Sequence, residues 1–313
     1  MKGWMHRIVR GLDCFLFESC DPRVVPILRI GFALMIIIQA LVLWPDAGYW
    51  FTDSGVMRTQ TAREILGPRS WSLLYYLPSE PWVVQSALAI WIVNGALMLV
   101  GFYSRVQAAA IFMWLVSFQN RNPSIHDGED TVFRIFAFLM VWLPLDAYWS
   151  IRKRGESLEP RQDSKNRADQ SGGRSVAADA WALRLFQVQM TAIYASTALS
   201  KLEGSTWNDG TAVWYVSRMT DNFGRWISPS WLDQPYASEL ATYGTLAIEC
   251  FLPFGLWIPR LRWLAICLGV LLHLGIEFSM NLFLFQWVMI LGLIAFVKLP
   301  SRVGSNAHGA SEG

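Results

Sequence analysis

The amino-acid sequence predicts an all-α fold, a polytopic transmembrane helical bundle of about eight spans preceded by an N-terminal interfacial helix. Of its 313 residues, 53% are hydrophobic and only 16% are charged. The mean hydropathy of +0.30 is higher than a soluble domain of this size usually has. Seventeen tryptophans indicate the same class, because Trp is enriched where apolar segments meet water. We therefore expect the lipid bilayer to be a partner. The net charge of +2, without a basic stripe, argues against nucleic acid.

Residues 1–23 are expected to form an amphipathic helix that lies in the membrane interface. Acidic residues, the first of them Asp13, interrupt the apolar run that a cleavable signal peptide needs. An ordinary capping helix fits the pattern as well. The apolar residues recur at helical spacing, as expected for one buried face; they are Trp4, Ile8, Leu12, Phe15 and Leu16.

Eight apolar runs approach the length needed to cross a hydrocarbon core of about 30 Å. The first four would form one membrane half, residues 24–150, and the last four a second half, residues 180–298, without a sequence repeat between them. Residues 151–179, which are polar and charged, predict a flexible cytoplasmic linker, and residues 299–313 a disordered cytoplasmic tail. The runs lie near Val24–Trp44, Trp82–Phe102, Arg105–Phe118, Thr131–Trp149, Ala180–Ser200, Glu239–Trp257, Arg262–Met280 and Leu282–Val297.

The distribution of Lys and Arg predicts the orientation. With a cytoplasmic N-terminus, the inner segments hold 16 of these residues and the outer loops hold 7. Because basic residues concentrate in cytoplasmic loops, we expect both termini on the cytoplasmic side of the inner membrane.

Cysteine and histidine do not indicate a metal site. The chain has four of each, without a CxxC pair or an HExxH motif. We therefore expect no metal.

Charged residues inside the predicted spans need an explanation, because each costs about 2.5–3.5 kcal/mol at mid-membrane. Arg29 and Arg184 lie near the predicted cytoplasmic face, which their long side chains can reach. Glu249 lies near the middle of the sixth run. It is either protonated and hydrogen-bonded within the bundle or a carrier of protons.

The other ionisable residues of the spans are expected at a similar depth near the outer face. Asp130 with Arg134, and His273 with Glu277, are four residues apart and can share a helix face; we expect Arg134 to pair with Asp130 or Glu129. Interhelical ties explain each residue singly, but convergence from three helices favours one polar cavity that opens to the outside. The residues are His126, Asp127, Glu129, Asp130, Arg134, Lys201, His273 and Glu277.

Lys201 is the candidate base. Burial beside apolar surface lowers the pKa of a lysine and yields a neutral amine. A structural tie is the alternative role.

Two stretches of the chain carry a family likeness. The first contains Gly101-Phe102-Tyr103-Ser104-Arg105 and Arg121-Asn122-Pro123, followed by Gly128-Glu129-Asp130. The second contains Ser200-Lys201-Leu202 with Trp207 and Gly210. Together they resemble the HTTM domain, the membrane module shared with vitamin K-dependent gamma-carboxylases.

This resemblance implies a carboxylase-like (lyase) enzyme that uses a quinone or hydroquinone. Lys201 would be its base and His273 a second catalytic residue, while Trp207, His126, Asp130, Arg134 and Glu277 would line the cavity. The chain also resembles the short bacterial type, similar to sporulation-delaying protein B, which implies a non-catalytic maturation or assembly factor for an exported peptide. Some relatives of that type occur with a thioredoxin-like protein. A transporter is disfavoured because the two halves show no repeat.

Overall fold

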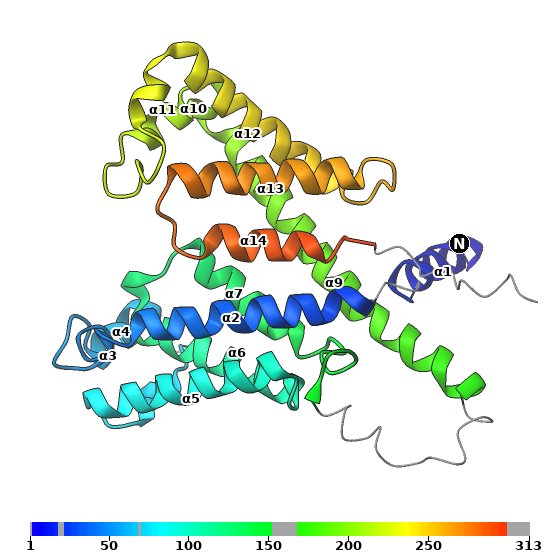
Figure 1. Cartoon of the computed structure of the whole chain (residues 1–313), viewed down its shortest axis with the longest axis horizontal. Helices are drawn as coiled ribbons and strands as arrows, with labels where there is room; N and C mark the ends of the chain where they lie inside the picture. Colours follow the sequence, from blue (N-terminus) through cyan, green and yellow to red (C-terminus); the bar gives the residue numbers. More distant parts are fainter. Residues whose placement is uncertain (1, 18–21, 68–69, 152–167, 299–313) are drawn as a thin grey trace, which may run out of the picture.

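The protein is all-α in the residues that its structure, a computed structural model, describes: 2–17, 22–67, 70–151 and 168–298. Helices α2, α5, α13 and α14 run alongside one another, and α9 crosses the molecule obliquely (Figure 1). The thirteen α-helices of these residues are α1 (Lys2–Phe17), α2 (Val25–Leu43), α3 (Ala47–Phe51), α4 (Thr59–Leu66), α5 (Pro81–Val100), α6 (Ser104–Arg121), α7 (Gly128–Met140), α9 (Ala168–Glu203), α10 (Ser205–Asn208), α11 (Ala212–Ser217), α12 (Pro235–Gly255), α13 (Arg262–Ser279) and α14 (Phe285–Ile294).

The helices pack in two groups. In the first group α2 packs on α5, α5 on α6 and α6 on α7, and in the second group α9 packs on α12, α12 on α13 and α13 on α14. Helix α14 also contacts α2, α7 and α9, so it forms the seam between the groups. Close approach at this seam depends on small residues: a Cβ placed on Gly292 would lie 2.3 Å from the sulfur of Met190.

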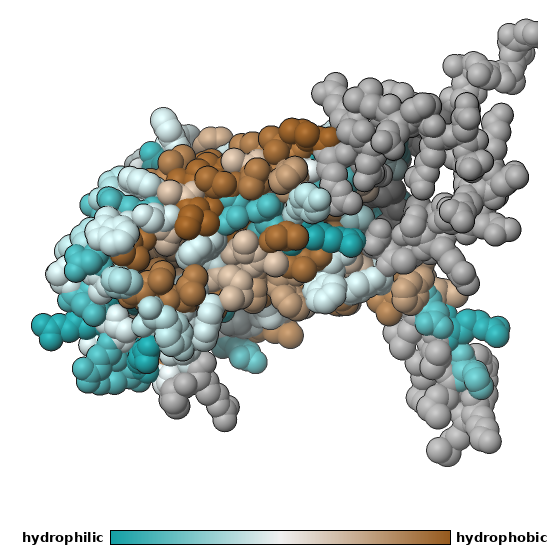
Figure 2. Space-filling model, turned by 90° about the horizontal axis from the view of Figure 1, so that it is seen from below, coloured by the Kyte–Doolittle hydropathy of each residue, from teal (hydrophilic) through white to brown (hydrophobic). Residues whose placement is uncertain are grey.

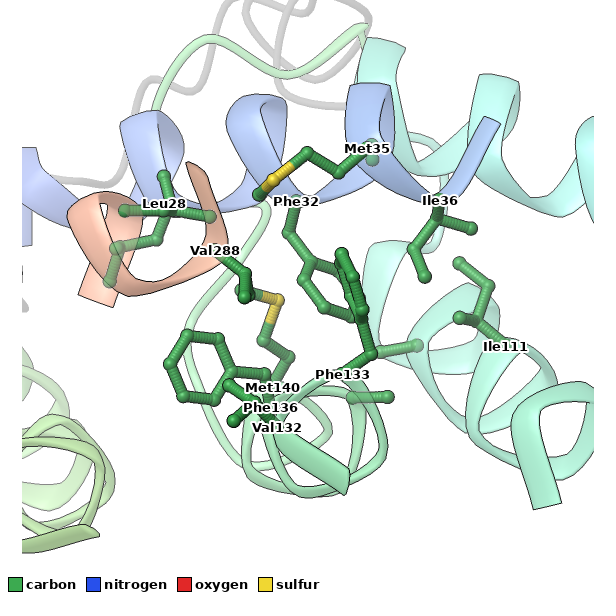
Figure 3. Packing of buried hydrophobic residues seen from close by; sticks show 14 of the residues in the cluster. Leu28, Phe32, Met35, Ile36, Ile111, Val132, Phe133, Phe136, Met140 and Val288 are labelled. Atoms are coloured by element: carbon green, nitrogen blue, oxygen red, sulfur yellow. The ribbon is translucent and has the colours of Figure 1, made fainter. Parts of the chain in front are cut away.

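One apolar core joins the two groups (Figure 3). Phe32 and Ile36 of α2 lie against Phe133 of α7, and Val288 of α14 reaches the same cluster. These side chains come from helices far apart in the sequence and are almost fully buried. Burial of this kind contributes about 25 cal/mol per Å², so the core fixes the two helix groups against each other.

Three helices, α2, α5 and α13, are long and apolar enough to cross a membrane, and α14 is apolar but shorter. Leu41 of α2, Val93 of α5 and Leu271 of α13 are each more than half exposed, which is favourable only where lipid replaces water. Apolar residues dominate the middle of the face in Figure 2, and polar ones gather at the end where α3 and α4 lie. Eight spans remain a prediction.

Several helix boundaries differ from those predicted from sequence. The fourth apolar run was expected to continue to Trp149, but α7 ends at Met140, because Pro144 cannot donate a backbone hydrogen bond and disfavours helix before it. Helix α6 is longer than its apolar run and α14 is shorter. Helix α9 already begins at Ala168, within the predicted linker. Residues 152–167 of that linker and the tail 299–313 lie outside the described residues.

The loops divide between the two ends of the bundle. The start of α9, the end of α14 and the N-terminal helix α1 lie at one end, and α3, α4, α10 and α11 at the other (Figure 1). Helix α1 packs on α9, and the ring of Phe15 lies 5.2 Å from that of Trp257. The end that carries α1 is called the N-terminal end below, and the opposite end the loop end.

Arg29 binds the turns after α7 at the N-terminal end of the first helix group. Its guanidinium is fully buried and donates hydrogen bonds to the carbonyl oxygens of Leu145 (2.7 Å) and Trp149 (2.6 Å). The expectation that Arg29 reaches the membrane face is wrong, because the turns after α7 fold back over it. Gly101, at φ +79°, makes this possible: a Cβ there would lie 2.7 Å from Arg29 Nη1.

Candidate functional site

Lys201 and Glu249 form an ion pair at the loop end of the second helix group. Lys201 Nζ lies 2.6 Å from Glu249 Oε2, and the two side chains are 21% and 10% exposed. Lys201 is in the last turn of α9 and Glu249 is in α12, which packs along α9. Trp207 of α10 places its ring 5.1 Å from the same Nζ. A cation beside an aromatic face and a carboxylate is held from two sides.

A second polar chain lies deeper in the bundle and joins α9, α13 and α14. The hydroxyl of Tyr194 is 2.8 Å from His273 Nε2, and His273 Nδ1 is 2.6 Å from Gln286 Oε1. All three side chains are at most 4% exposed. Because Gln286 Oε1 can only accept, His273 carries its proton on Nδ1, and Nε2 accepts from the Tyr194 hydroxyl.

The two polar groups are neighbours. Tyr194 and Lys201 are seven residues apart and share a face of α9, and Glu249 interacts electrostatically with Tyr194, as Lys201 does with His273. Helices α9, α12, α13 and α14 thus all contribute to one polar cluster, which we call the lysine cluster: Tyr194, Lys201, Glu249, His273 and Gln286. Hydrogen-bonded chains of this kind can hold and move a proton.

Glu277 belongs to a separate ion pair. It lies one turn beyond His273 on α13, and its carboxylate accepts a hydrogen bond from Arg225, in the segment that follows α11. The backbone of this segment also hydrogen-bonds to the end of α13: Gly224 N donates to Ser279 O at 2.9 Å. Glu277 therefore helps to hold the 218–228 segment on the bundle.

A cavity of about 300 Å³ lies in the first helix group, between α2, α5, α6 and the start of α7. Gln39, His126 and Asp130 line it together with aromatic side chains. Gln39 Nε2 donates to Asp130 Oδ1 at 3.1 Å, and Glu129 Oε2 accepts from the backbone of Leu284 at 3.0 Å. The predicted polar residues are thus divided: His126 and Asp130 line this cavity, whereas Lys201 and His273 belong to the lysine cluster.

Burial changes the charge of two groups at the start of α7. Burial away from water, together with the nearby negative charges of Asp127 and Asp130, raises the pKa of Glu129 to about 8. Burial and the charge of Arg134 lower the pKa of His126 to about 4. Both groups are therefore mainly uncharged at pH 7.

Arg134 does not make the expected pair. Among the described residues, neither Asp130 nor Glu129 forms an ion pair with it: Asp130 is bound by Gln39 and by the backbone of Asp127, and Glu129 by the backbone of Leu284. Both carboxylates are engaged at the N-terminus of α7, where Asp127 and Asp130 form a capping box. The pairing was wrong because it treated these carboxylates as free.

The Arg121-Asn122-Pro123 segment ties together the loops of the first helix group. Arg121 is 1% exposed and donates to Met57 O at 2.7 Å and to Asp53 Oδ1 at 2.9 Å. Asn122 Nδ2 donates to Trp50 O at 2.9 Å. Both residues connect the end of α6 to the 50–57 segment, so this stretch stabilises the fold.

Comparison with known proteins places the chain in a family. The model of the HTTM domain matches residues 17–300, nearly the whole chain. The chain belongs to the HTTM domain family. Together with the three candidate membrane helices, this makes it a multi-pass membrane protein.

A relative of this HTTM protein is the "Uncharacterized protein YitO" of Bacillus subtilis (strain 168), which is 22% identical over 207 residues. The match covers 64% of this chain and 63% of the relative, so the chain spans less than two thirds of the relative's length. No solved structure matches the chain.

Three members of these sites in the HTTM protein were not among the candidates predicted from sequence: Tyr194, Gln286 and Gln39. Each lies within a helix on the face turned to the bundle and is at most 6% exposed. Uncharged polar residues in apolar helices often serve only as helix ties, which is why composition did not single them out. Their spacing could have done so, because Tyr194 lies two turns before Lys201 on the same face.

Proposed function

We propose that this HTTM-domain protein is a membrane enzyme that performs acid–base chemistry at Lys201, on a hydroquinone-type substrate that it uses to modify an exported peptide. The proposal depends on one observation, the 2.6 Å contact between Lys201 Nζ and Glu249 Oε2 in a mostly buried position. At this distance a proton can pass directly between Lys201 and Glu249, as a base at Lys201 requires.

In this proposal Lys201 accepts the proton of a substrate hydroxyl, which becomes an oxyanion beside the new ammonium group. Glu249 holds the proton that Lys201 gives up to become the free amine, and the pair resets when the extra proton taken from the substrate passes to the product or to water. Tyr194 and His273, hydrogen-bonded to each other beside the pair, help to hold the cluster in place.

The residues around Lys201 fit a quinone ring chemically. The amine can hydrogen-bond to a quinone or hydroquinone oxygen, and the indole of Trp207, 5.1 Å from Nζ, offers a flat face for a ring. Such a group would supply the oxidisable ring of carboxylase-like chemistry. Lys201 and Trp207 would hold and orient it.

The test uses reduced menadione with the purified protein in lipid nanodiscs. Deprotonation speeds oxidation of a hydroquinone by dissolved oxygen, so the wild type should accelerate this oxidation and Lys201→Arg should not, because guanidinium stays protonated over the whole pH range of the assay. Arg218→Gln is the control, since Arg218 pairs with Asp233 at the exposed loop end. Equal rates for wild type and Lys201→Arg would exclude Lys201 as the base.

A second candidate function is a non-catalytic maturation or assembly factor for an exported peptide. The observation that favours it is the exposed aromatic surface of the 226–236 segment, where Trp226, Trp231 and Tyr236 are 76%, 75% and 83% exposed. Such residues are enriched in binding surfaces and at membrane interfaces. In this case Lys201→Arg would leave peptide maturation intact, whereas replacement of all three aromatic residues by Ser would abolish it.

We also propose that the N-terminal end of the bundle faces the cytoplasm, supported by the 16 to 7 division of basic residues. Alkaline phosphatase, which is active only outside the cytoplasm, should be inactive when fused after Gly172 and active when fused after Arg225. The opposite pattern would reverse the orientation.

A further inference from the structure

The cavity of the first helix group contains two buried polar atoms that have no hydrogen-bond partner in the described part of the chain. They are Oε1 of Gln39, whose side chain is 6% exposed, and Nε1 of Trp91, which is 1% exposed. Both residues line the cavity. An unpaired buried donor or acceptor costs about 1–3 kcal/mol, so these two atoms indicate that something else occupies the space beside them.

Gln39 and Trp91 lie at the same depth. Helices α2 and α5 run in opposite directions and pack closely, and a Cβ on Gly95 would lie 2.7 Å from Ile37 and 3.6 Å from Ala33 O. One turn before Gly95, α5 is therefore level with position 39 of α2. Gln39 and Trp91 thus line one cavity from neighbouring helices, and each carries a buried polar atom without a partner among the described residues.

The cavity favours an uncharged occupant. His126 and Glu129 are mainly neutral at pH 7, for the reasons given above, and Phe51, Leu115 and Phe118 form an apolar wall. Asp127 and Asp130 disfavour anions. Val42 also lines the cavity and is 54% exposed on the side of α2, so the cavity reaches the apolar surface of the bundle.

We propose that this cavity binds a neutral, lipid-soluble molecule with a hydroxyl group, a phenol or an alcohol, that donates to Gln39 Oε1 and accepts from Trp91 Nε1. A hydroxyl oxygen performs both tasks at once. The volume is sufficient, since a cavity of about 150 Å³ holds benzene and this one measures about 300 Å³. The site is separate from the lysine cluster and does not depend on the proposed chemistry of Lys201.

The first experiment compares matched ligands on the wild-type protein in lipid nanodiscs. 4-Pentylphenol can donate and accept, its methyl ether can only accept, and pentylbenzene can do neither. Saturable binding, followed by calorimetry, should weaken by about 3- to 10-fold for the ether, and further for pentylbenzene. Equal binding of all three, or no saturable binding because water alone fills the cavity, would overturn the proposal.

The second experiment removes each protein group singly. Trp91→Phe deletes the indole N–H, and Gln39→Met deletes the amide at similar length. Each should weaken binding of 4-pentylphenol by about 3- to 10-fold, and Gln39→Met should leave binding of the ether unchanged. Trp82→Phe, on the same helix but 65% exposed and away from the cavity, is the matched control. Unchanged phenol binding in both cavity variants would contradict the assignment, and the ligand series decides it if a variant does not fold.

Discussion

Arg121 and Lys201 are basic residues at the loop end of the bundle, in the two stretches that carry the family likeness, yet their surroundings differ. Arg121 is 1% exposed, and its guanidinium donates to a backbone carbonyl and to Asp53. Lys201 is 21% exposed, and its ammonium contacts Glu249 and the Trp207 ring. The donors of Arg121 bind backbone and side chain of the 50–57 segment, whereas the ammonium of Lys201 has one hydrogen-bond acceptor, Glu249, among the described residues. A family motif alone does not separate these two uses; the partners do.

If Arg121 is architectural, Arg121→Met should have the largest effect on stability. It removes two hydrogen bonds of a charged group, each worth about 1.5–3 kcal/mol, so we expect a loss of about 3 kcal/mol. The exposed Arg58, in the same loop region, provides the control variant Arg58→Met. Thermal unfolding in detergent measures the stability of both variants, and equal melting temperatures would show that Arg121 does not stabilise the fold.

Gly101→Ala tests the architecture at the N-terminal end. Alanine is strained at φ +79°, and its Cβ would lie 2.8 Å from the Cα of Ser150. We expect a loss of about 2 kcal/mol, from the strained backbone and the displaced contacts. Gly244→Ala in α12, where a Cβ meets nothing within 4 Å, should be neutral or slightly stabilising. Similar losses in both variants would show that the fold does not need this turn.

The lysine cluster should respond differently, because its two charged members compensate each other. Lys201→Met leaves Glu249 without its partner and should cost about 1–2 kcal/mol, and the double variant with Glu249→Gln should recover most of this loss. Function should not recover in the double variant if the pair moves protons. Recovery of both stability and function would reduce Lys201 to a structural tie.

Glu129 should give an effect that depends on pH. Its pKa is about 8 in the folded protein, against about 4.5 when solvated, so its contribution to stability is complete below pH 4.5 and is lost as the pH rises through 8. Glu129→Gln should match the wild type near pH 5 and melt at a higher temperature at pH 9. Parallel melting curves across this range would mean that Glu129 ionises normally.

Arg134 was expected to pair with Asp130 or Glu129, and the structure shows why the sequence alone could not decide this. Asp130 lies four residues before Arg134, at the spacing of a helical ion pair, but Asp130 caps α7 and binds Gln39 instead. Spacing along one helix shows which side chains are close enough to interact. It does not show which hydrogen-bond partners a second helix supplies, and Gln39 comes from α2, 91 residues away in the sequence.

The sequence by itself determined the helical class, the apolar helices α2, α5 and α13, and the family, because apolar periodicity and short motifs are local properties. Only the tertiary structure decided that the polar residues form two sites instead of one. Gln39 and Trp91 meet the start of α7 in one helix group, and Tyr194, Lys201 and Glu249 meet His273 and Gln286 in the other. These partners are brought together by burial of a shared apolar core, which depends on the packing of all helices at once.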